Sequence, residues 1–162
     1  MKTRNVTASA TTTKPVEIRI TVTRFREVLA PGKTSPCTTY TMDLARKDPR
    51  AYIKGDDLYI KGPGAGIRFT LASSAADKKS YYPIGIAFVR ESTRNESDAQ
   101  RLGFLNFPQS ETRMKGRTLS ILDTFKDRSK RIRFKFSVII QRGSDGAIGI
   151  IDPGIVHEPT HH

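Results

Sequence analysis

The sequence predicts an all-β protein, an antiparallel β-sandwich of about nine short strands, with a jelly-roll-like variant as its alternative. Three observations predict this class. Apolar residues alternate with polar ones in several short runs, which is typical of strands with one buried face. Gly, Pro and Asp punctuate these runs at near-regular spacing. No long run has the 3.6-residue period of a helix.

The first and last strong runs are the clearest. Apolar residues alternate with Glu, Arg and Thr over 16–23, which predicts a strand. Residues 131–155 predict a β-hairpin: an alternating strand over 131–140, a Gly/Asp turn at 143–146, and an apolar return over 147–151. We expect Asp152-Pro153-Gly154 to end that return strand, because proline cannot donate to a ladder.

Shorter runs between these two predict the remaining strands, which are 38–44, 51–54, 58–61, 67–71, 82–88 and 118–122. Turns are expected at 55–57 and in the glycine run 62–66, and loops at 31–36 and 72–80. The polar span 91–103 could contain a short helix at 97–102 that ends at Gly103.

The strand predicted over 82–88 has one unusual face. Alternation places Tyr82, Ile84, Ile86 and Phe88 on its apolar side, so that two small residues lie on the other. Small residues in a strand indicate close approach of a ligand or a neighbouring chain. The interface candidates are therefore Gly85, Ala87, Tyr81 and Tyr82.

The chain of 162 residues fits one domain. We expect a flexible basic Thr/Ser-rich arm at 1–15, a single β-sandwich domain at 16–156 and a disordered tail at 157–162. The only cysteine, Cys37, allows no intrachain disulfide. No apolar run approaches the roughly 20 residues of a membrane helix, and no apolar signal segment follows the N-terminus. We therefore expect no membrane span and a cytoplasmic location.

The charge balance points to polyanions. Lys and Arg outnumber Asp and Glu by 28 to 16, which gives a net charge of +12. Bases two apart on a strand lie about 6.6–7 Å apart on one face, a spacing that suits phosphates. Alternatively, these cations only make the outer face soluble and protect strand edges. The polyanion-binding candidates are Arg113, Lys115, Arg117, Lys126, Arg128, Lys130, Arg131, Arg133 and Lys135.

Two motifs resemble metal sites, and we interpret both otherwise. Residues 157–161 spell H-E-x-x-H, but the zinc-protease motif requires a helix, which Pro153 and Pro159 oppose. The Gly55-Asp56-Asp57 turn resembles the hairpin that carries metal-binding aspartates in viral RNA polymerases. Asp and Gly are also the residues that tight turns prefer. The sequence therefore predicts neither a metal nor a cofactor.

Catalysis is not expected either. All three histidines lie within 157–162, so no Ser-His-Asp or Cys-His site is expected inside the fold. Cys37 has no internal histidine to activate it. The sequence predicts a protein that is not an enzyme.

The C-terminal hairpin resembles a known family. The run Ile148-Gly149-Ile150-Ile151 followed by Asp152-Pro153-Gly154-Ile155 is similar to the D-P-x-I close of the PixA/AidA inclusion-body family and of related small bacterial β-sandwich proteins. The likeness covers about 25 residues, and the chain lacks the tryptophan that this ending typically carries. The resemblance implies a cytoplasmic β-sandwich without known catalysis that tends to self-associate, and it carries over no catalytic residue.

Two functions follow as expectations. The first is a non-catalytic module that acts through protein contacts, as a homo-oligomer or with a protein partner, using strand edges and the face with Gly85 and Ala87. The second is a polyanion-binding or coat-like protein, in which the basic arm and residues 113–135 contact nucleic acid.

Overall fold

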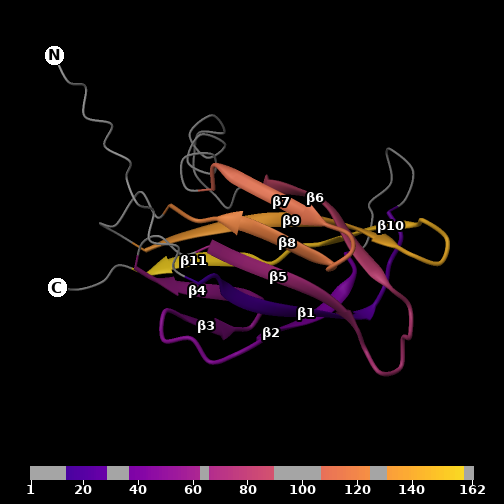
Figure 1. The fold of residues 1–162 in the computed structure, drawn as a ribbon, viewed down its shortest axis with the longest axis horizontal. Coiled ribbons are helices and arrows are strands. Elements are labelled where there is room, and N and C mark those ends of the chain that lie inside the picture. Colours follow the sequence, from indigo (N-terminus) through magenta and orange to yellow (C-terminus); the bar gives the residue numbers. More distant parts are fainter. Residues whose placement is uncertain (1–13, 29–36, 63–65, 90–106, 125–130, 159–162) are drawn as a thin grey trace, which may run out of the picture.

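The computed structural model describes residues 14–28, 37–62, 66–89, 107–124 and 131–158. Within these ranges it contains eleven strands and no helix. The strands form two sheets packed face to face, so the predicted β-sandwich class is confirmed, with more strands than expected (Figure 1). No helix in the described part of the chain could cross a membrane.

The two sheets divide the strands almost equally. Sheet A has the order β2-β1-β5-β8-β7, with bounds β1 (Val16–Arg24), β2 (Thr39–Leu44), β5 (Gly66–Ser73), β7 (Gln109–Arg113) and β8 (Thr118–Leu122). Sheet B contains β3 (Ala51–Lys54), β4 (Asp57–Lys61), β6 (Tyr81–Val89), β9 (Ile132–Arg142), β10 (Ile148–Ile151) and β11 (Gly154–Glu158). Strand β9 is its centre, since it pairs with β6, β10 and β11.

Both sheets are mixed, so the prediction of an antiparallel sandwich is wrong for two strand pairs. β1 pairs parallel with β5, and β4 pairs parallel with β11. Alternation in a sequence fixes which face of a strand is buried, but not the direction of its neighbour. These parallel pairs join segments that are far apart in the chain, which local patterns do not reveal.

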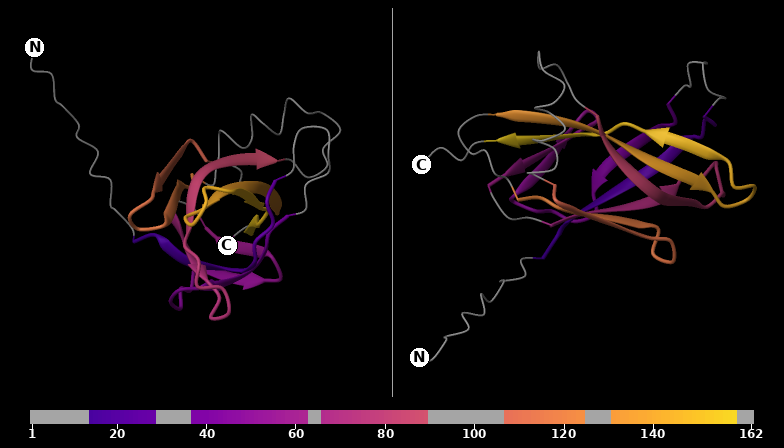
Figure 2. Two further views of the ribbon diagram at one scale, coloured as in Figure 1. Left: turned by 90° about the vertical axis from the view of Figure 1, so that its right-hand side faces the viewer. Right: turned by 90° about the horizontal axis from the view of Figure 1, so that it is seen from above.

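The core lies between the sheets and follows the predicted alternation. Val16, Ile18, Ile20 and Val22 of β1 are fully buried. Across the core, the rings of Phe69 and Phe136 pack with centroids 5.5 Å apart. The end-on view in Figure 2 shows the two sheets around a common centre, with β6 arching over one side.

The predicted C-terminal hairpin is confirmed, but its second strand runs further than expected. Ile151 pairs with Val138 and Gly154 with Lys135, so β10 and β11 keep one register along β9. The amide of Phe136 donates to the carbonyl oxygen of Pro153 at 3.2 Å. Pro153 has no backbone N–H, so it cannot donate the second hydrogen bond of this pair. Proline removes one hydrogen bond here without ending the strand.

This continuation corrects the predicted tail at 157–162. His157 and Glu158 belong to β11, and the side chain of His157 is fully buried. Contact with the buried Asp123 carboxylate makes it possible to bury this polar ring.

Strand β6 also departs from its predicted alternation. Pro83 pairs with Ile140 and Gly85 with Ile139, so Ile84 is an extra residue in a β-bulge. The bulge shifts the phase: Tyr81 is 1% exposed, whereas Ile84 is 40% exposed. Tyr81 is therefore a core residue, and its prediction as an interface residue is wrong.

Several predictions concern residues outside the described ranges. They are the arm up to residue 13, the loop 29–36, the centre of the glycine run at 63–65, the helix at 97–102, and the end of the H-E-x-x-H motif at 159–162.

Candidate functional site

Arg133 and Lys135 of β9, together with Arg131 just before the strand, form a basic row on the outward side of sheet B. Both arginines of this row interact with other side chains. Arg133 donates two hydrogen bonds to the Asp57 carboxylate, at 2.8 and 2.9 Å. Arg131 lies over the Tyr59 ring, 5.1 Å from its centroid. Lys135 is half-buried and also has an interaction partner. The charged groups of this row therefore interact with other groups of the same chain.

The aromatic rings beside this row are also occupied. Tyr59 and Tyr52 stack with centroids 4.6 Å apart, and Lys61 lies 5.1 Å from the Tyr52 ring. The Tyr52 hydroxyl donates to Glu158 Oε1 at 2.8 Å. A base-stacking platform needs exposed ring faces, and Tyr59 is only 8% exposed. The stacked rings therefore stabilise the outer face of sheet B, and the buried ring of Tyr59 offers little surface on which a nucleobase could stack.

The other described basic candidates lie on sheet A, in the hairpin between β7 and β8. Arg113 pairs with Glu111 at 2.8 Å, and Lys115 is exposed. Arg117 lies 5.8 Å from the centroid of the Tyr82 ring. Lys126, Arg128 and Lys130 lie outside the described residues. The structure thus divides the predicted polyanion face between two sheets, and does not join its described members into one patch.

The Gly-Asp-Asp segment forms the turn between β3 and β4. Gly55 has a positive φ of 61°, the left-handed conformation that glycine adopts easily. The Asp56 carbonyl accepts from the Gly154 amide at 3.0 Å, and a Cβ at position 154 would overlap the Asp57 carboxylate. Within the described ranges, no three His, Cys, Asp or Glu side chains are grouped so as to hold a metal ion.

The single thiol is restrained by a neighbouring carboxylate. Cys37 Sγ donates to Asp152 Oδ2 at 3.0 Å, while Ser137 Oγ donates to the other oxygen at 2.5 Å. The hydrogen bond to Asp152, followed by partial burial and the charge of Asp152, raises the pKa of Cys37 to about 11. The thiol therefore stays protonated near neutral pH, whereas the nucleophilic form of a cysteine is the thiolate.

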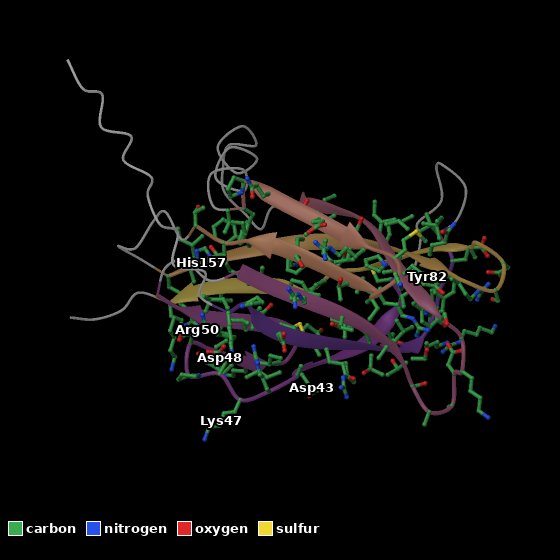
Figure 3. The ribbon with its side chains drawn as sticks, viewed as in Figure 1. Asp43, Lys47, Asp48, Arg50, Tyr82 and His157 are labelled. Atoms are coloured by element: carbon green, nitrogen blue, oxygen red, sulfur yellow. The ribbon has the colours of Figure 1, made fainter. Side chains whose placement is uncertain are left out.

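A histidine–aspartate pair lies inside the fold, contrary to the predicted disordered tail at 157–162. His157 Nε2 lies 2.8 Å from Asp123 Oδ2, and the two side chains are 0% and 1% exposed. The rings of Phe107 and Phe134 pack around the imidazole, with centroids 5.6 and 4.9 Å away. Figure 3 shows His157 near one end of the molecule and Tyr82 near the other. The pair is closed to solvent, and it links β11 to Asp123, the residue that follows β8.

The strand edges of sheet B differ in how they are covered. The apolar strand β10 is capped by backbone from two other segments. Val28 N donates to Ile148 O and Thr38 N donates to Ile150 O, both at 2.8 Å. The apolar strand β6 has no such cover: in the described residues, β9 is its sole ladder partner.

The hydrogen bonds of β9 show which groups of β6 remain open. Because Phe136 N donates to Pro153, the even-numbered residues of this part of β9 direct their backbone groups toward β10 and β11. Ile86 and Phe88 of β6 stand opposite Val138 and Phe136, so they do not bond to β9. The N–H and C=O groups of Ile86 and Phe88 point away from β9, and we call them the outer edge of β6.

The other edge strands carry features that discourage pairing. β3 has four residues, and all five residues of the polar strand β7 are exposed, with Arg113 and Glu111 paired on it. β2 has Asp43 on its exposed side. β6 is nine residues long and has no charged residue. Pro83 and the bulge protect its first half only, which leaves 85–89 as a regular, uncharged edge.

Two of the predicted interface residues are placed beside this edge. Ala87 is exposed and Gly85 is half-exposed, and both face outward with Ser137 and Ile139 of β9. Tyr82 precedes the bulge at the far end of β6 and is half-buried. Gly85 and Ala87, which stand out in the sequence by their small size, thus lie on an edge strand, and their role as interface residues stays a prediction.

No protein-family model matches this chain, and no curated protein matches it. The resemblance to the PixA/AidA family stays a prediction.

Proposed function

We propose that this protein is a non-catalytic β-sandwich module that acts through protein–protein contacts and self-associates at the outer edge of β6. One observation carries the proposal: a regular, uncharged edge whose backbone groups at Ile86 and Phe88 face away from the ladder with β9. Unpaired edges of this kind accept another strand.

The charge distribution supports the same surface. With a net charge of +12 each, two copies repel each other overall. β6 has no charged residue, so it is a place where two copies can approach closely. Gly85 and Ala87 leave its outward face without bulky side chains.

A lysine at this edge tests the proposal. We expect the wild-type protein to change from monomer to dimer between about 5 and 500 μM, the range of a small interface. Ala87→Lys is expected to stay monomeric, because an exposed lysine at a strand edge opposes pairing. Light scattering after size exclusion measures both, and circular dichroism verifies the fold.

Thr41→Lys is the matched control. Thr41 is exposed on β2, an edge strand of sheet A, so this variant gains the same charge on another edge. It is expected to associate as the wild type does. A monomeric wild type at every concentration would contradict the proposal. A monomer that co-elutes with nucleic acid at low salt, recognised by its 260/280 nm absorbance ratio, would favour polyanion binding instead.

A further inference from the structure

We infer that the partner at this edge is a second copy of the chain, whose β6 pairs antiparallel with the first about a two-fold axis at Ala87. This inference rests on the proposed function and specifies its geometry. The result would be one continuous sheet through both molecules, in the order β9-β6-β6-β9.

The position of the axis follows from the regular part of β6. The bulge at Ile84 ends regular pairing on one side, and the described pairing of β6 with β9 runs to Val89 on the other. Among the described residues, 85–89 therefore form the longest stretch of β6 that can pair without interruption, and Ala87 is its midpoint. A symmetric pairing that uses the whole stretch has to place the axis there.

The alternation of backbone hydrogen-bonding groups along β6 agrees with this register. With the axis at Ala87, Ile86 of each copy stands opposite Phe88 of the other. These are the residues whose N–H and C=O groups point outward, so both pairs can exchange two hydrogen bonds. Ala87 then faces its own symmetry mate in a pair without hydrogen bonds, the type in which side chains come closest.

Small size at position 87 suits this closest contact. Ala87 is exposed on the outward face, and its neighbour on that face, Gly85, has no side chain. On the same side of the sandwich, β7 comes near β6, yet no ladder joins the two in the described residues. In the described residues, β7 therefore takes none of the outward N–H and C=O groups of Ile86 and Phe88 into a ladder.

A cysteine on the axis tests the register. In a Cys37→Ser background, Ala87→Cys is expected to form a disulfide-linked dimer in a mild redox buffer. The two Cα atoms would be about 4.5 Å apart, within the 4.4–6.8 Å of disulfides. The control is Ile84→Cys, which is 40% exposed on the same strand. Its symmetry mate would lie roughly 20 Å away, so we expect at least about tenfold less linked dimer.

The outcomes separate the two claims. Linked dimer from Ala87→Cys but not from Ile84→Cys supports the register. If light scattering shows a dimer and Ala87→Cys does not link, the two-fold pairing at Ala87 is wrong while self-association stands. If the protein remains a monomer and no variant links, both fail.

Discussion

Asp123→Ala is expected to lower the free energy of unfolding by about 1–3 kcal/mol, the usual cost of removing the hydrogen-bond partner of a buried polar group. The variant leaves His157, which is fully buried, without its 2.8 Å contact to a carboxylate. The aromatic rings of Phe107 and Phe134 offer no equivalent acceptor. Urea unfolding followed by circular dichroism measures the loss, since the chain has no tryptophan.

An exposed aspartate provides the control for Asp123→Ala. Asp43 lies on the outward face of β2, and Asp43→Ala is expected to change stability by less than about 0.5 kcal/mol. A double variant tests whether the cost comes from the partner that is left behind. Asp123→Leu with His157→Phe removes both polar groups, so it should recover much of the stability that Asp123→Ala loses. Equal stability of Asp123→Ala and the wild type would show that the pair does not hold β11 in place.

Gly149→Ala is expected to cost about 1–3 kcal/mol or more, because the added Cβ has no room. That atom would lie 2.7 Å from Cε2 of Phe25, 2.9 Å from Thr38 Oγ1 and 3.0 Å from the backbone oxygen of Arg26. Thr38 Oγ1 is itself fixed, since it accepts from Arg26 N at 3.0 Å and donates to Arg26 O at 3.1 Å. The segments that cap β10 would have to move away.

Gly116→Ala is the matched control for Gly149→Ala. Its Cβ would meet only Thr118 at 3.5 Å, an ordinary contact, so stability should stay the same or rise slightly. Urea unfolding compares the two variants. If Gly149→Ala were as stable as Gly116→Ala, this result would contradict the close packing of the capping segments against β10.

Local patterns predicted most strands of this fold, but not its connections. Alternation identified β1 and the β9–β10 hairpin, because each has one buried face. The five polar residues of β7 show no alternation, since all are exposed, and that strand was missed. The sequence does not reveal strand β11, because Pro153 predicts the end of a strand, whereas in the structure proline removes only one bond of a ladder that continues.

The candidate site was predictable only in part, for similar reasons. Gly85 and Ala87 stood out by their small size. The exposure of Ile84 and the burial of Tyr81 depend on a bulge that alternation does not show. Contacts such as Asp57–Arg133 and Asp123–His157 join distant parts of the chain, so sequence spacing gave no sign of them.

Amide hydrogen exchange at two protein concentrations tests self-association at the outer edge of β6 most directly. The Ile86 amide points away from β9, so its exchange should be fast at about 5 μM and markedly slower at about 500 μM, where the edge is paired. The Ala87 amide points toward Ser137 of β9 and should be protected equally at both concentrations. An Ile86 exchange rate that does not depend on concentration, in a range where the protein remains folded, would contradict the account.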